Sequence, residues 1–211
     1  MMVIAIEKRS WSDTRRFLDQ MYGLRAKVFD ERLGWQVAAR DGRERDTFDD
    51  LDPVYILAVT AKNEVVGCAR LLPAMGQTML LSVFPQLVSE QAFHPHARMI
   101  ESSRFCVDTT TQRKGRGGLH HVTRLMFAGI LEWCLSRGYT EVVTVTDIAV
   151  ERILGLAGWS LHRLGPPQMV GQTTALAGVL SVDAGIFQQV RPVGYVSTFD
   201  RPAAPTSSVL S

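Results

Sequence analysis

Residues 100–108 place a carboxylate, Glu101, and a guanidinium, Arg104, three positions apart among apolar neighbours. The segment is short and is bounded by a turn at 94–96 and by a Thr/Gly/Arg-rich loop, which is typical of a strand. Both charges are costly in a half-buried strand unless they are paired or bind a ligand. Strict alternation would put them on opposite faces, whereas a β-bulge would bring them to one side. The alternatives are therefore a functional site and a structural ion pair at the end of a sheet.

Two more arginines stand among apolar residues. Arg25 shares one side of a predicted helix with Met21 and Val28, so its side chain either reaches past that face to solvent or faces a ligand cavity. Arg70 lies within a predicted strand. Each is therefore a charge that calls for a partner or a ligand.

Residues 30–52 form a charged segment without clear periodicity, and Phe29 at its start, Trp35 and Phe48 are isolated aromatics. A loop of this length is usually functional or mobile, whereas its composition alone favours a solvated surface loop. The aromatic residues argue against full solvation, because they need something to cover.

The remaining elements predict one α/β domain with a mixed sheet. A first strand at 3–6 precedes a helix that Ser12 or Asp13 can cap and that continues to Val28. Strands at 54–60 and 65–72 form an antiparallel hairpin. After the strand at 100–108, a strong amphipathic helix at 119–137 ends before Gly138. It is followed by a strand at 141–147, a helix at 149–157, strands at 159–164 and 173–180, and a last helix at 183–190.

Composition fits one globular domain of 211 residues, 46% hydrophobic and 21% charged. A net charge of +2 makes no case for nucleic-acid binding. Cys68, Cys106 and Cys134 are widely spaced in apolar runs, as expected for buried thiols of a reducing compartment and not for disulfides or metal ligands. The start does not resemble a signal peptide, and no apolar run approaches membrane-spanning length. We therefore expect a cytoplasmic protein with no membrane partner.

Eight charged and aromatic residues stand in one characteristic order along the chain: Arg25, Phe29, Trp35, Asp46, Asp49, Arg70, Glu101 and Arg104. With the blocks 24–29, 48–49, 67–73 and 101–108, this set resembles the LuxI-type acyl-homoserine lactone synthases. The resemblance covers about residues 1–195, is much more specific than a single short motif, and is greatest to the branch found in plant-associated α-proteobacteria.

The resemblance implies a fold like that of the GCN5-related N-acetyltransferases. Residues 1–197 would be a single α/β domain with a mixed, largely antiparallel sheet flanked by helices, and 198–211 a flexible tail. The substrates would be S-adenosylmethionine and an acyl-[acyl-carrier protein]. The amine of S-adenosylmethionine attacks the acyl thioester, and its carboxylate then displaces methylthioadenosine to close the lactone. S-adenosylmethionine is thus a substrate, and no cofactor, metal or nucleic acid is expected.

The resemblance also assigns roles at the reacting end. Glu101, Arg104 and Arg25 are the expected catalytic residues: Glu101 takes the proton of the amine or else braces an arginine, and the two arginines position substrate. A mixed cluster of charges suits a zwitterion, and aromatic rings can cover the adenosyl group. The expected S-adenosylmethionine-binding residues are Arg25, Phe29, Trp35, Asp46, Asp49, Arg70 and Arg104.

For the acyl chain, the resemblance places Ser103 and Thr144 where the chain enters the sheet. A hydroxyl there can bind a 3-oxo group, so 3-oxo-acyl substrates are expected. The acyl chain would lie in a tunnel. Without the resemblance, most of the residues lining it would be interpreted as ordinary core residues; they are Phe105, Met126, Phe127, Ile130, Thr146 and Leu154.

Residues 112–117 fit the loop with which acetyltransferases of this superfamily bind the coenzyme A pyrophosphate. Here the loop would receive the phosphopantetheine phosphate, and nearby basic residues would face the acidic carrier protein; the candidates are Arg113, Lys114, Gly115, Arg116, Gly117 and Arg152. The same loop supports an alternative, a coenzyme A-dependent N-acetyltransferase; a non-enzymatic sensor is a third. The set Arg25, Trp35, Asp46 and Asp49 favours the synthase, because ordinary N-acetyltransferases need no S-adenosylmethionine site.

Overall fold

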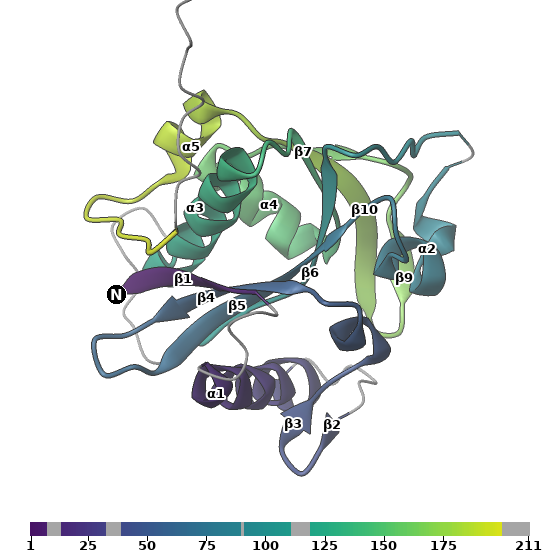
Figure 1. The fold of residues 1–211 in the computed structure, drawn as a ribbon. Coiled ribbons are helices and arrows are strands. Elements are labelled where there is room, and N and C mark those ends of the chain that lie inside the picture. The colour runs from purple at the N-terminus through teal and green to yellow at the C-terminus, as the bar shows by residue number, and fades with distance from the viewer. Residues whose placement is uncertain (8–13, 33–38, 90, 111–118, 200–211) are drawn as a thin grey trace, which may run out of the picture.

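The computed structural model describes residues 1–7, 14–32, 39–89, 91–110 and 119–199. Eight strands form one sheet with helices on both faces (Figure 1). The main path of the sheet is β1 (Met2–Ile6), β4 (Val54–Val59), β5 (Val65–Pro73), β6 (Met99–Val107), β7 (Glu141–Asp147), β10 (Thr173–Ser181) and β8 (Leu161–Arg163), and β9 (Gln168–Val170) also pairs with β10. Within the described part of the chain, the pairings of this sheet are antiparallel except for β6 with β7. The predicted mixed, largely antiparallel sheet is confirmed.

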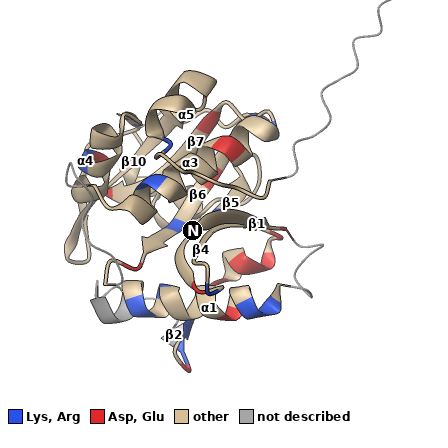
Figure 2. Cartoon of the chain, turned by 90° about the vertical axis from the view of Figure 1, so that its left-hand side faces the viewer, with Lys and Arg blue, Asp and Glu red and all other residues tan. Residues whose placement is uncertain are grey.

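The helices cover the two faces of the sheet (Figure 1). On one face α1 (Arg15–Ala26) packs against β5 and β6, and α2 (Met79–Val83) with the 3-10 turn Pro85–Leu87 lies further along. On the other face lie α3 (His121–Ser136) and α4 (Ile148–Ala157), and α5 (Ala184–Val190) packs on α3. Charges of both signs are spread over the ribbon, including along α1 (Figure 2).

The apolar face predicted for the amphipathic helix is the buried face of α3. Gly129 lets this helix lie close to β1 and β4, because a Cβ there would be 2.5 Å from Val3 Cγ1 and 3.2 Å from Ile56 Cγ2. The predicted glycine after the helix, Gly138, has a φ of 77°, the left-handed conformation that ends many helices. The local sequence thus sets both how close α3 packs and where it stops.

The N-terminal region departs from the expected elements. The helix α1 begins at Arg15, and the predicted caps, Ser12 and Asp13, lie outside the described residues. It ends at Ala26 and passes into a π-helical turn, Lys27–Arg32.

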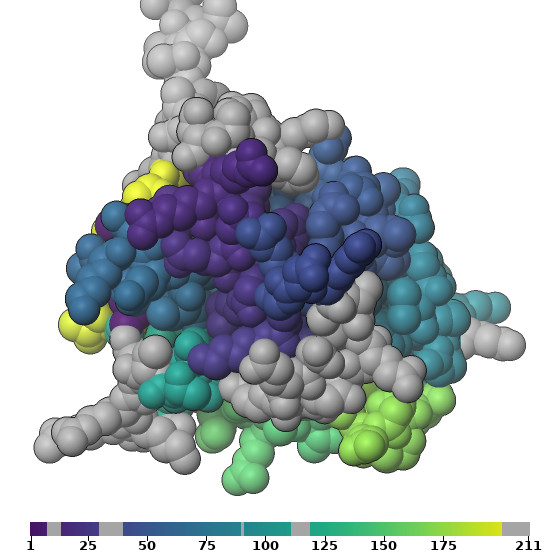
Figure 3. All heavy atoms as spheres, turned by 90° about the horizontal axis from the view of Figure 1, so that it is seen from below, coloured from purple at the N-terminus to yellow at the C-terminus, as the bar shows by residue number. Residues whose placement is uncertain are grey.

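The end of the segment predicted as a loop is ordered as a hairpin and a turn. The strands β2 (Ala39–Arg40) and β3 (Arg43–Glu44) are joined by Asp41 and Gly42, whose φ angles of 52° and 71° suit a tight hairpin turn. A 3-10 turn, Thr47–Asp50, follows. Seen from the side of α1, the first third of the chain, purple to blue, forms much of the molecular surface (Figure 3).

A β-bulge interrupts the pairing of β5 and β6. Two residues of β6, Arg104 and Phe105, oppose one residue of β5, Ala69. Arg104 has a φ of 53°, a left-handed conformation that is uncommon for residues with a side chain. The bulge brings Arg104 to the same face of the sheet as Glu101, while Phe105 packs into the core beneath α3. The structure thus has the bulge that the sequence analysis named as one alternative.

The strands β6 and β7 pair over only part of their lengths. Their ladder runs from Met99 with Glu141 to Ser102 with Thr144, although both strands continue beyond these residues. After α5 the chain returns to β1, where Thr198 N donates to Val3 O. Within the described residues, none of the helices has both the length and the apolar character needed to span a membrane.

Candidate active site

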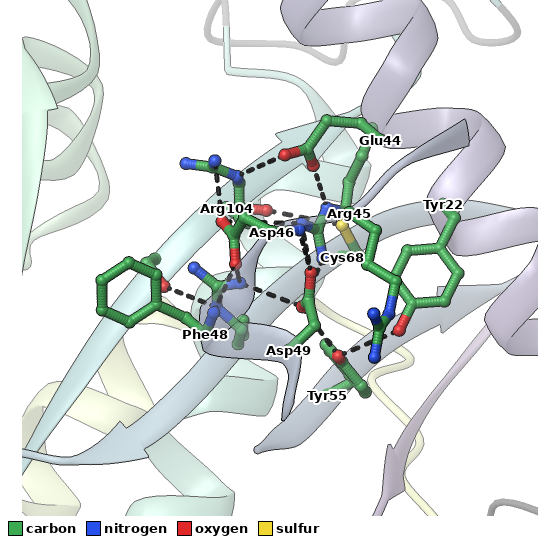
Figure 4. Close-up of polar contacts among 12 residues, drawn as sticks. Tyr22, Glu44, Arg45, Asp46, Phe48, Asp49, Tyr55, Cys68 and Arg104 are labelled. Carbon is green, nitrogen blue, oxygen red and sulfur yellow. Dashed lines mark hydrogen bonds and ion pairs between the residues drawn. The ribbon is translucent and has the colours of Figure 1, made fainter. Parts of the chain in front are cut away.

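Six charged side chains meet on the face of the sheet that α1 covers, and we call them the charged cluster (Figure 4). They come from separate elements, so that arginines alternate with carboxylates. Four of them are buried with 0% of the residue exposed, and the other two side chains are 10% and 14% exposed. The four buried members are Arg25 from α1, Arg70 from β5, Glu44 from β3 and Asp49 from the 3-10 turn. The two partly exposed members are Arg104 from β6 and Asp46, which precedes the turn.

Asp49 lies at the centre of the charged cluster. Arg25 binds it at two points, Nη1 to Oδ1 at 2.8 Å and Nη2 to Oδ2 at 2.9 Å. Arg70 Nη1 and the Tyr55 hydroxyl donate to the same Oδ1 at 2.9 and 2.8 Å. Burial raises the pKa of the Asp49 carboxyl, but the hydrogen bonds and charges of Arg25 and Arg70 outweigh burial and lower the pKa below its usual range. Asp49 is therefore an anion at neutral pH.

The 3-10 turn holds its own carboxylates in place. Asp46 Oδ1 accepts from Phe48 N, and Asp49 Oδ2 accepts from Asp46 N, both at 2.9 Å, as a reciprocal capping box. Asp46 also pairs with Arg70 and, at 2.8 Å, with Arg104 Nη2. The short spacing of the two aspartates along the chain thus suffices to aim both at the arginines.

Glu44 is a member of the charged cluster that the sequence analysis missed. Its carboxylate accepts from Arg25 Nε at 2.5 Å and from Arg104 Nε at 3.1 Å. One signal could have found it: Glu44 and Asp46 are two residues apart in extended backbone, so their side chains share one side. The many charges around them in the sequence hide this pattern.

Aromatic rings and a thioether complete the surroundings of the arginines. The guanidinium of Arg104 lies 5.6 Å from the centroid of the Phe29 ring, and that of Arg70 lies 5.4 Å from the Phe48 ring. The Met79 sulfur is 3.3 Å from Arg104 Nη1 and 3.7 Å from Arg70 Nη2. Phe29 and Phe48, the two isolated aromatics that lie within the described residues, therefore do cover something, namely guanidinium groups.

Glu101 is 2% exposed and lies on the same face of β6 as the arginines. Its oxygens accept from the backbone N–H groups of Met79, at 2.8 Å, and Leu80, at 2.7 Å, at the start of α2. The predicted alternative of a structural ion pair is thus corrected, because the close partners of Glu101 are backbone donors and not Arg70 or Arg104. Burial raises the pKa of Glu101 above its usual value, more than these hydrogen bonds and Arg70 lower it. A raised pKa suits a group that must take up a proton.

Most residues expected to contact an acyl chain lie on the other face, beneath α3 and α4. The Phe127 ring lies 5.2 Å from Phe105 and 5.8 Å from Trp159, centroid to centroid. In the apolar core around these rings, Met126, Ile130 and Leu154 are 0–3% exposed, and Thr146 is half-buried.

Two expected acyl contacts are hydroxyl residues at the ladder of β6 and β7. Thr144 Oγ1 donates to Ser102 O at 2.8 Å, at the last pair of the ladder. Ser103 lies apart from the other expected acyl contacts, because its Oγ accepts from Arg70 Nε at 3.1 Å on the face of the charged cluster.

Several expected site residues fall outside the described part of the chain. These are Trp35 and the whole loop with Arg113, Lys114, Gly115, Arg116 and Gly117. Arg152 is exposed on α4, where a partner could reach it. In the described residues, no group of three or more His, Cys, Asp and Glu side chains is placed to hold a metal ion. The expectation that the reaction needs no cofactor stays a prediction.

The fold is shared with N-acyltransferases of known structure. An N-acetyltransferase fold from Lactobacillus plantarum matches with a TM-score of 0.57 at 16% identity over 87% of this chain and 100% of that chain, a likeness of fold alone. The coenzyme A-dependent acyl-homoserine lactone synthase BjaI, solved with SAM and isopentyl-CoA, matches with a TM-score of 0.84 at 26% identity over 96% and 95% of the two chains. The predicted likeness to the N-acetyltransferase fold is confirmed.

Sequence comparison narrows this class to one family. The family model of the autoinducer synthases matches residues 10–190. A probable acyl-homoserine-lactone synthase of Sinorhizobium fredii is 49% identical over 96% of this chain and 100% of its own length, and an acyl-homoserine-lactone synthase of Agrobacterium fabrum is 48% identical over 93% and 94%. The chain belongs to the acyl-homoserine-lactone synthases, which are acyltransferases that make quorum-sensing autoinducers. The resemblance read from the sequence, including its α-proteobacterial branch, is confirmed, and the N-acetyltransferase alternative is set aside.

Proposed function

We propose that this enzyme makes an N-acyl-L-homoserine lactone from S-adenosylmethionine and an acyl-[acyl-carrier protein]. The observation that carries the proposal is the charged cluster beside Glu101. S-adenosylmethionine presents an ammonium, a carboxylate and a sulfonium, and buried arginines interleaved with carboxylates suit both signs of charge. BjaI, solved with SAM, supports this choice of substrate for a member of the same family.

In this proposal the charged cluster binds the amino-acid end of S-adenosylmethionine. The guanidinium groups of Arg25, Arg70 and Arg104 receive the carboxylate, and Asp46 and Asp49 hold the cationic end. Phe29 and, on the resemblance alone, Trp35 cover the adenosyl group. The ion pairs among these residues support the assignment, because they fix the planes of the guanidinium groups before a substrate arrives.

The reaction then takes two bond exchanges. The amine nitrogen attacks the thioester carbonyl carbon, so that the amide C–N bond forms and the C–S bond breaks. Glu101 takes one amine proton, directly or through a water, and the leaving thiolate takes up a proton to become the free thiol. The methionine carboxylate oxygen next attacks its own γ-carbon, the sulfonium C–S bond breaks, and methylthioadenosine leaves as a neutral thioether.

We assign the acyl chain to the apolar face beneath α3 and α4, lined by Phe105, Met126, Phe127, Ile130, Thr146 and Leu154. Thr144 supports this path because it stands where the ladder of β6 and β7 ends, between the charged cluster and the apolar face. Its hydroxyl can also accept or donate a hydrogen bond to a substrate, which favours 3-oxo-acyl chains. Ser103, bonded to Arg70, would act at the entrance on the charged side.

The carrier protein is the proposed donor, although BjaI is coenzyme A-dependent. Both donors present a phosphopantetheine, for which Arg113, Lys114, Gly115, Arg116 and Gly117 are the candidate contacts, and exposed Arg152 suits an acidic carrier protein. Residues 1–197 would form the catalytic domain, with 198–211 as a C-terminal tail. We place the enzyme in the cytoplasm, which its three buried free thiols support.

The test compares different acyl donors while S-adenosylmethionine remains the acceptor. The purified enzyme is incubated with S-adenosylmethionine and either acyl-carrier protein or acyl-coenzyme A, each with and without a 3-oxo group. Lactone and methylthioadenosine are quantified by mass spectrometry. We expect equal amounts of the two products, and faster turnover with the 3-oxo-acyl-carrier protein. Acylated S-adenosylmethionine without methylthioadenosine would reject the coupled reaction, and faster turnover with acyl-coenzyme A would reject the carrier protein as the preferred donor.

A further inference from the structure

Tyr55 lies in a cross-strand row with two residues of the site. In the register of β4 and β5 it is paired with Arg70, and Arg70 is paired with Ser103 of β6. Tyr55 is 1% exposed, so its hydroxyl must find its partners inside the protein. The row places this hydroxyl beneath the charged cluster, on the side away from the β-bulge at Arg104 (Figure 4).

One partner of this hydroxyl is the central carboxylate of the charged cluster. Tyr55 donates to Asp49 Oδ1 at 2.8 Å, the same oxygen to which Arg25 and Arg70 donate. Behind it, the Tyr22 hydroxyl lies 3.3 Å from the Tyr55 hydroxyl, and the Arg25 guanidinium lies 5.4 Å from the centroid of the Tyr22 ring. The two tyrosines therefore pack directly against members of the charged cluster.

A third donor on Asp49 Oδ1 has a geometric consequence. Arg25 and Arg70 bind this oxygen from different elements. The Tyr55 hydroxyl, held on β4, fixes where the oxygen lies between them. Burial, and the negative charge of Asp49, raise the pKa of Tyr55 far above neutral pH, so the hydroxyl keeps its proton and remains a donor. Hydrogen bonds to charged groups are among the stronger ones in proteins.

We propose that Tyr55 is a positioning residue for the amino-acid end of S-adenosylmethionine. Its hydroxyl fixes the Asp49 carboxylate and, through it, the orientation of the Arg25 and Arg70 guanidinium groups. This inference rests on the proposed function, since it takes the charged cluster to be the site for that part of the substrate. The positioning role of Tyr55 does not involve the adenosyl group, for which Phe29 is the proposed contact.

The variant Tyr55→Phe removes the hydroxyl and keeps the ring. We expect its dissociation constant for S-adenosylmethionine, measured by calorimetry, to rise by about tenfold or more, the equivalent of one hydrogen bond to a charged group. Methylthioadenosine lacks the amino-acid end, so its dissociation constant should stay within about twofold, which is below one such bond. A purely structural defect would weaken both ligands together.

The matched control is Tyr195→Phe, which also deletes a hydroxyl that donates to a carboxylate, Glu132 Oε2 at 2.9 Å, on the opposite face of the sheet. This variant should bind both ligands as the unaltered enzyme does. The inference is overturned if Tyr55→Phe binds S-adenosylmethionine normally, loses both ligands equally, or does not fold. Failure of the unaltered enzyme to bind S-adenosylmethionine would instead defeat the proposed function, and the inference with it.

Discussion

At the scale of single residues, the charged cluster is held together by shared acceptors. Asp49 pairs with Arg25 and Arg70, Glu44 pairs with Arg25 and Arg104, and Asp46 pairs with Arg70, with Arg104 and, at 4.0 Å, with Arg25. Each arginine thus has at least two carboxylate partners, and each carboxylate has at least two arginine partners. Because buried charges are costly without partners, the loss of any one member leaves at least two others with one partner fewer.

Asp49→Asn tests this arrangement. The substitution keeps the size of the side chain but removes the negative charge between two buried guanidinium groups. We expect the free energy of unfolding, measured in urea, to fall by about 3–5 kcal/mol. The matched control is the neighbouring Asp50→Asn, whose ion pair with Arg45 joins side chains 51% and 59% exposed, and its effect should stay within about 1 kcal/mol. Similar losses for the two variants would contradict the view that burial decides the contribution.

Glu101→Gln tests the proton acceptor. If Glu101 takes the amine proton, single-turnover acylation should slow by about 10²–10⁴-fold, the usual reach of general-base catalysis. The amide has one oxygen for two backbone donors, so one of the N–H groups of Met79 and Leu80 would face an NH₂ group. The melting temperature should therefore fall as well, and acylation must be measured below it. Acylation at the normal rate by the folded variant would leave Glu101 as an anchor of α2 only.

At the scale of elements, the bulge lets β6 place a charged side chain on one face of the sheet and an aromatic side chain on the other. Arg104 takes up a left-handed conformation with φ of 53°, which costs a residue with a side chain of order 1 kcal/mol. The surrounding structure compensates, since Cys68 Sγ donates to Arg104 O at 3.4 Å and the side chain binds Glu44 and Asp46. Strain is thus accepted at the one position of β6 where regular alternation would turn the guanidinium away from the site.

The packing of α3 on the sheet can be tested at Gly129. In Gly129→Ala the new Cβ would meet Val3 Cγ1 at 2.5 Å, so the helix must move and the free energy of unfolding should fall by about 1–3 kcal/mol. The matched control is Gly155→Ala in α4, where nothing lies within 4 Å of the new Cβ. There the better helix propensity of alanine should raise the free energy of unfolding by about 0.5–1 kcal/mol. Urea denaturation of both variants measures the difference, and stabilisation by Gly129→Ala would refute the close-packing argument.

At the scale of the whole molecule, the two faces of the sheet have different tasks. The charged cluster draws on α1, β3 and the 3-10 turn, all from the first 50 residues, whereas the apolar face lies beneath α3 and α4, from residues 121–157 (Figure 1). The strand β6 serves both, with Glu101 and Arg104 on one face and Phe105 on the other. The partial ladder of β6 and β7 lies between these faces, which is where an amine and an acyl group would have to meet.

The order of the main helices and strands, the family and most members of the charged cluster could be predicted from the sequence alone. Hydrophobic periodicity and glycine positions are local properties, so the hairpin of β4 and β5, the buried face of α3 and its end before Gly138 follow from neighbouring residues. Family blocks in one order likewise need no coordinates. The Asp-Gly turn between β2 and β3 was also readable from the sequence, although the charged segment was interpreted as a loop.

Which of these residues touch depends on the tertiary fold. Glu44 and Arg104 are 60 positions apart, and Glu101 and Met79 are 22 apart, so their contacts depend on which elements the fold places side by side. For the same reason Glu101 binds the start of α2 instead of an arginine, Ser103 joins Arg70 instead of the apolar face, and Tyr55 supports Asp49. Residue types limit the possible partners of a charge, but the choice among them is made by strand register and by one bulge, which are properties of the assembled sheet.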